Sequence, residues 1–154
     1  MASVAILLVI VGGYFFWQNH DQTRQSEAPS LPNPGPVLEA KETEKIQSLL
    51  ERIREANLKK NIDLFMSCYT LDFKDRDKKK LDTLENWKKF DYLDLAYDLK
   101  EQAISGDSAH IRVEWRMKIS QKGSGKPQDN RTVLDVVLKK EGEDWKIKDI
   151  QPIS

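Results

Sequence analysis

One stretch of eleven residues, Ala109 to Ile119, constrains the fold more than any other part of the chain. Apolar residues occupy its odd positions and polar residues its even positions. A period of two is that of a β-strand, whose successive side chains point to opposite faces of a sheet. We therefore predict a long central strand with one buried face. The polar positions, His110 among them, are expected to face solvent.

Further strands are predicted on either side of this segment. Apolar residues alternate from Leu93 to Leu99, and the alternation slips at Ala103 and Ile104, where we expect a β-bulge before a turn at 105–108. After a glycine-rich hairpin connection, residues 132–138 are apolar on both faces, and a last strand carries Trp145, Ile147 and Ile150.

The segments upstream have helical periodicity. Ile46, Leu49, Leu50, Ile53 and Ala56 recur at intervals of three and four, which predicts an amphipathic helix. Asn61 is positioned to cap a second, shorter helix.

Between this second helix and the strands, we predict a short strand at Leu71 and Phe73 and a solvated charged loop at 74–80. A third helix is predicted to begin near Asp82, with Trp87 on its inner edge. Helices followed by an antiparallel sheet give an α+β fold.

Composition limits the functional classes that the chain can belong to. The chain has 154 residues, 25 basic and 25 acidic, so its formal net charge of zero argues against nucleic acid as a principal partner. A single cysteine, Cys68, excludes an internal disulfide, and the two histidines at 20 and 110 have no ligand spacing for a metal. We predict no metal and no cofactor.

The N-terminal segment differs in composition from the rest. Residues 2–17 carry no charge and end in the aromatic run Tyr14–Trp17, which predicts a single membrane-anchor helix over residues 1–20. A cleaved signal peptide and a buried core helix in a soluble protein are the alternatives. We expect an inner-membrane, single-pass protein with its domain on the extracytoplasmic side.

A proline-rich segment separates this anchor from the domain. Residues 21–42 include Pro29, Pro32, Pro34 and Pro36, and such a composition favours an extended tether. The predicted organisation is therefore an anchor at 1–20, a tether at 21–42 and one domain at 43–154.

The order of these elements resembles the nuclear transport factor 2-like superfamily, which has a cone-shaped, cystatin-like α+β fold. The features that carry the resemblance are two amphipathic helices, the segment 69–73, a helix bearing Trp87, and long strands ending in Asp144–Ile147. The resemblance covers about Glu44 to Ile153. It is closest to the domain at the C-terminus of some bacterial L,D-transpeptidases and related envelope proteins, but the transpeptidase Cys/His module is absent from this sequence.

Superfamily members include SnoaL-like isomerases and dehydratases, whose cone holds an acid/base pair, and non-catalytic assembly modules. In this chain Asp135 is the only carboxylate in a strongly apolar strand and is a weak candidate for a catalytic acid. A pocket in the cone would be lined by four aromatic side chains. These are Tyr69, Trp87, Tyr97 and Trp115.

We predict from this pattern a membrane-anchored binding module without catalytic activity. Apolar residues on both faces of the strand at 132–138 predict a homodimer formed through the sheet. A protein partner in a bacterial envelope or cell-wall assembly is implied by the family resemblance alone. The alternative is a small-molecule-binding domain or an isomerase or dehydratase that uses the cone as its pocket.

Overall fold

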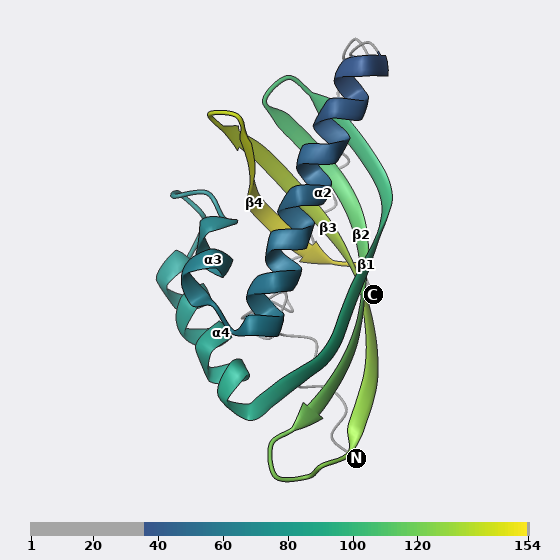
Figure 1. The fold of residues 1–154 in the computed structure, drawn as a ribbon. Helices are drawn as coiled ribbons and strands as arrows, with labels where there is room; N and C mark the ends of the chain where they lie inside the picture. Colours follow the sequence, from purple (N-terminus) through teal and green to yellow (C-terminus); the bar gives the residue numbers. More distant parts are fainter. Residues whose placement is uncertain (1–35, 154) are drawn as a thin grey trace.

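The computed structural model describes residues 36–153, in which three helices precede four strands (Figure 1). The membrane anchor predicted for residues 1–20 and most of the predicted tether lie outside these residues. Within the described part of the chain, no helix has the length and apolar character needed to cross a membrane.

The longest helix, α2 (Pro36–Lys59), carries the predicted apolar stripe, and every residue of that stripe is buried. Proline is favoured at the first position of a helix because the missing N–H would have no intrahelical partner there. Residues 36–42, which the sequence placed in the tether, thus form the first turns of α2. The helix ends where Lys60 adopts a left-handed conformation with φ of 53°.

Two shorter helices follow at one end of α2. Helix α3 (Ile62–Ser67) is capped as predicted by Asn61, whose side chain accepts a hydrogen bond from the N–H of Leu64 at 3.1 Å. The predicted strand at residues 71–73 is wrong, because only Tyr69 bridges to Ile147 and the chain then turns. The predicted loop at 74–80 is also wrong in part, since α4 (Arg76–Lys89) begins six residues before Asp82.

The four strands form one antiparallel sheet in the order β1-β2-β3-β4. They are β1 (Phe90–Ser105), β2 (Ser108–Gln121), β3 (Pro127–Glu141) and β4 (Asp144–Pro152). The long alternating segment lies in β2, one of the two central strands, as predicted. The break in alternation in β1 lies between Leu99 and Glu101 rather than at Ala103, and a second register shift lies between Tyr92 and Asp94.

Helix α2 lies across one face of the curved sheet, with α3 and α4 beside its C-terminal end (Figure 1). This inner face of the sheet and the apolar stripe of α2 together form the core. No described helix covers the opposite, outer face. The α+β class, with N-terminal helices packed on a curved antiparallel sheet, is therefore confirmed.

A polar clamp joins α2 to the far edge of the sheet. Glu42 accepts hydrogen bonds from the indole Nε1–H of Trp145 at 2.7 Å and from Lys140 Nζ at 2.9 Å. The Lys140 ammonium also lies 5.2 Å from the centre of the Trp145 ring, a cation–π contact. Burial would raise the pKa of Glu42, but the hydrogen bonds from Lys140 and Trp145 hold that pKa below its ordinary value. The clamp holds the N-terminal half of α2 against β3 and β4.

Candidate functional site

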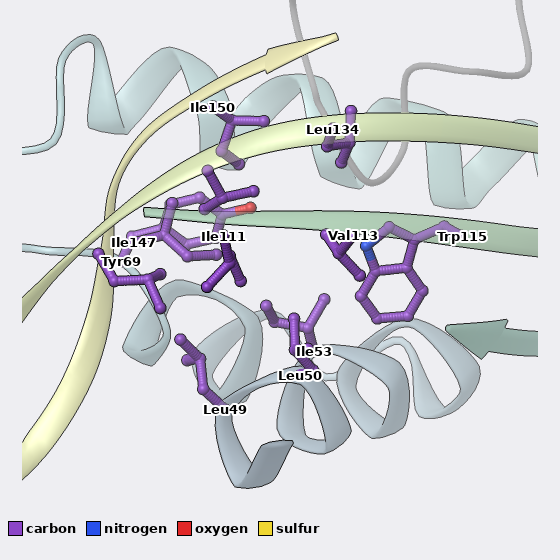
Figure 2. A pocket seen from close by; sticks show the side chains of 12 residues that line it. Leu49, Leu50, Ile53, Tyr69, Ile111, Val113, Trp115, Leu134, Ile147 and Ile150 are labelled. Carbon is purple, nitrogen blue, oxygen red and sulfur yellow. The ribbon is translucent and has the colours of Figure 1, made fainter. Parts of the chain in front are cut away.

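The interior of the cone is the first place to look for a binding site, and its own side chains fill it. The cavity between α2 and the sheet measures about 10 Å³, which is room for about one water molecule. Figure 2 shows Leu49, Leu50 and Ile53 of α2 pointing toward side chains from β2, β3 and β4. Apart from Tyr69 and Trp115, every residue lining the cavity is aliphatic. A substrate-sized molecule would have to displace part of this core.

The four aromatic residues predicted to line a pocket do not gather around one space. Tyr69 and Trp115 line the small cavity. Trp87 packs edge-on against Phe65 and donates its Nε1–H to the buried Asn57 side chain at 3.2 Å. Tyr97 packs against Trp115 with ring centres 5.2 Å apart, and its hydroxyl donates to the carbonyl of Gln47. These contacts give the indole and phenol groups partners within the fold.

Asp135, the candidate catalytic acid, lies on the outer face of the sheet. Arg112 Nε donates to its carboxylate at 3.0 Å, and His110 Nε2 lies 3.8 Å from the same oxygen. Asp135 is absent from the residues that line the interior cavity. The sheet therefore separates this carboxylate from the cone. A catalytic acid would have to face the interior, where the substrate would bind, and Asp135 does not.

The outer face carries charged side chains along all three of its long strands. Besides the pair of Arg112 with Asp135, Arg116 pairs with Asp98 at 3.1 Å, and Arg131 pairs with Glu114 at 2.6 Å. Glu114 is buried beneath Arg131, with 6% of its side chain exposed. Most of the polar chemistry of the described sheet therefore lies on this outer face.

With this geometry in place, comparison with known proteins assigns the chain to a family. Residues 39–154 match the sequence profile of the family described as "Anti-sigma-I factor RsgI9, C-terminal domain". The chain belongs to this family. The match spans the whole domain, from the first turns of α2 to the end of the chain. No curated protein sequence matches the chain.

Solved structures similar to this domain have the nuclear transport factor 2-like fold. A ketosteroid isomerase-like protein from Erwinia carotovora atroseptica is 20% identical, with a TM-score of 0.61 over 73% of this chain and 97% of its own. A nuclear transport factor 2-like superfamily protein from Salmonella enterica is 11% identical, with a TM-score of 0.60 over 74% and 91%. A hexachlorocyclohexane dehydrochlorinase is 13% identical, with a TM-score of 0.57 over 77% and 93%. At these identities the likeness establishes the fold and confirms the resemblance to the nuclear transport factor 2-like superfamily seen in the sequence.

A buried lysine is the feature of this domain that the sequence analysis missed. Lys79 of α4 is 3% exposed, and its ammonium lies 5.2 Å from the ring centre of Tyr69 and 6.0 Å from those of Phe65 and Phe73. Desolvation lowers the pKa of Lys79 to about 7, while the carboxylate of Asp82 acts in the opposite direction.

The helical period contained a signal for this burial. Thr83 and Trp87 are buried at a spacing of four, and one further step toward the N-terminus reaches Lys79. The run of charges around Lys79 led to the prediction of a solvated loop, which hid this periodicity.

We predict that Lys79→Met stabilises the domain at pH 7, by roughly 1–3 kcal/mol, because methionine keeps the apolar stem without a buried ammonium. In the wild type the folded-state pKa of Lys79 lies below the unfolded value, so the unfolded state binds more protons between about pH 7 and pH 10.5. The free energy of unfolding contributed by Lys79 therefore rises with pH across this window. The free energy of unfolding of Lys79→Met, measured by denaturant titration at several pH values, should lack the rise that Lys79 causes in the wild type.

The matched control is Lys80→Met at the neighbouring exposed position, which should leave both the stability and its pH dependence close to those of the wild type. A Lys79→Met variant that is less stable than the wild type at pH 7, and whose free energy of unfolding still rises with pH as in the wild type, would contradict the claim that the buried ammonium is destabilising.

Proposed function

We propose that the chain is a membrane-anchored binding module that acts through the surface of its nuclear transport factor 2-like domain. The observation that carries the proposal is the filled interior, in which the cavity of about 10 Å³ leaves no space for a substrate. Ligand pockets in proteins commonly measure about 300–1,000 Å³. A domain of this fold without such a pocket can bind a partner only through its outer surface.

The alternative is a small-molecule-binding or SnoaL-like isomerase or dehydratase domain. Its support is the fold, since structures with the same fold include a ketosteroid isomerase-like protein and a dehydrochlorinase. Such chemistry needs a proton donor or acceptor within hydrogen-bond reach of the bound substrate. Among the described residues that line the cavity, only Tyr69 has a side-chain oxygen, and Asp135 lies across the sheet from it. The binding module is therefore the better-supported function.

The membrane part of the proposal rests on the sequence and on the family. Residues 2–17 are uncharged and of nearly the length of a membrane-spanning helix, and a proline-rich segment follows them. The family is named for the C-terminal domain of an anti-sigma-I factor. We place this domain on the extracytoplasmic side of the inner membrane, where it would bind a protein of the envelope or of a cell-wall assembly.

This placement predicts that the full chain sediments with membranes, resists carbonate extraction and dissolves in detergent. Protease added outside spheroplasts should degrade the domain, because it lies beyond the membrane. Leu8→Arg places a charge within the apolar run and should release the protein from the membrane. Gln18→Arg, just past the run, is the matched control and should leave it bound. Recovery of the wild-type chain in the soluble fraction would contradict the anchor.

Homodimerisation through the sheet is a further part of the proposal. The outer face of β3 carries Val137, which is 39% exposed, opposite His110 of β2. A second copy would cover this end of the outer face.

Sedimentation equilibrium of the full chain in density-matched detergent should therefore show a dimer at high micromolar concentration. Val137→Lys should shift the equilibrium toward monomer, because it would bury a charge in the interface. Leu81→Lys, at an exposed apolar position on α4, should not change it. A wild-type chain that stays monomeric would contradict the dimer.

A further inference from the structure

A groove of about 440 Å³ crosses the outer face of the sheet, at the end remote from Val137. It runs over β1, β2 and β3, and its volume falls in the range typical of ligand sites. Its outward-facing lining consists of five charged residues and one alanine. These are Asp94, Ala96, Arg116, Lys118, Asp129 and Arg131.

The strand register arranges these side chains in two rows across the sheet. In one row Ala96, Arg116 and Arg131 are direct neighbours on β1, β2 and β3. In the other row Asp94, Lys118 and Asp129 are direct neighbours. The rows are two residues apart along each strand, a spacing of about 7 Å. The small side chain of Ala96 leaves space beside Arg116.

The two arginines are held in place while keeping unused hydrogen-bond donors. Arg131 contacts the buried Glu114, and Arg116 contacts Asp98, each through one terminal nitrogen. A guanidinium has five N–H donors, so each arginine has further donors available. Two arginines oriented by carboxylates in this way suit the planar, bidentate recognition of another carboxylate.

The second row contains charges that are not neutralised by one another. Lys118 and Asp129 are cross-strand neighbours, yet neither forms an ion pair within 4.0 Å with any residue in the described range 36–153. Among the described residues, the side chain of Asp94 accepts a hydrogen bond only from the adjacent N–H of Leu95, at 2.9 Å. Charged side chains that form no ion pair on the surface are available to bind a partner.

We propose that this groove binds an extended peptide segment of a partner protein, which carries an acidic and a basic residue two positions apart. The carboxylate lies between Arg116 and Arg131, and the basic side chain lies at the outer end of the second row, against Asp129. Side chains two residues apart in an extended chain lie on one face about 7 Å apart, the spacing of the two rows. This inference rests on the proposed function and names the chemistry of the partner.

The flanking carboxylates select against other anions. Asp94 and Asp129 repel a segment that is acidic throughout, so an isolated acid followed by a base fits better than an acidic run. The same repulsion disfavours inorganic phosphate, which carries more charge than a carboxylate. The groove therefore favours a mixed-charge segment.

The test is a titration of the full chain in a neutral detergent with blocked pentapeptides, followed by amide chemical shifts. The acetylated and amidated peptide Thr-Glu-Thr-Lys-Thr should give saturable shifts at the six groove positions. Replacing its glutamate by glutamine, or its lysine by glutamate, should weaken binding at least threefold. Equal binding of all three peptides, shifts that do not saturate, or full competition by inorganic phosphate would overturn the proposal.

Charge reversal in the protein gives the decisive comparison. Arg116→Glu removes a partly exposed arginine and should abolish binding of the mixed peptide while allowing Thr-Lys-Thr-Lys-Thr to bind. Lys139→Glu, at an exposed position of β3 outside the groove, is the matched control and should bind as the wild type does. Unchanged binding in Arg116→Glu would overturn the proposal.

The same spectra separate the failure of this inference from the failure of the proposed function. Groove positions that do not respond to peptide contradict the peptide site alone. Saturable shifts of interior residues such as Ile111 and Leu134 on addition of benzene would instead contradict the binding-module function.

Discussion

The packing of one helix against the concave face of the sheet is the interaction on which the rest of this structure depends. Helix α2 buries Ile46, Leu49, Leu50 and Ile53 against the inner faces of the strands. Each such side chain contributes about 1.5–3 kcal/mol when it is fully buried. The Glu42 clamp holds the other half of the helix to Trp145, at the far edge of the sheet. The position of α2 thus decides whether the cone has an interior pocket.

Because apolar side chains fill the interior, most charged side chains of the sheet lie on its outer face. On that face Arg131 of β3 pairs with Glu114 of β2, and the carboxylate of Asp135 is held by Arg112. A catalytic domain of this fold would need the reverse arrangement, with polar groups facing inward and tuned by burial. The one strongly perturbed cation in the described structure, Lys79, is enclosed by aromatic rings at the α3 and α4 end. Its contacts support a structural role.

The sequence predicted most of the architecture because strict periodicity reports burial. The alternation from Ala109 to Ile119 identified a central strand, and the spacing from Ile46 to Ala56 identified the covering helix. The start of α4 was missed because the run of mixed charges at 74–80 is typical of a solvated loop, and burial of Lys79 depends on rings from other segments. The local signal of that burial was the spacing of four that links Lys79 to Thr83 and Trp87.

The candidate site was harder to predict than the fold. The pocket-lining role assigned to four aromatic residues assumed an open cone, and no periodicity tells an open cone from a filled one. Tyr69 and Trp115 do face the interior, whereas Trp87 packs between the helices. The groove at Arg116 and Arg131 was not foreseen because it depends on cross-strand register, which brings together residues 96, 116 and 131.

The central claim is that the cone is closed by its own side chains, and apolar-ligand binding tests it most directly. Benzene would be added to the full chain in detergent, and the methyl shifts of Leu49, Ile111 and Leu134 would be followed by NMR. The account predicts no saturable shift in the wild type, and a saturable shift in Leu50→Ala, where the deleted side chain opens a dry cavity. Saturable binding of benzene by the wild-type interior would contradict the claim and favour the small-molecule function.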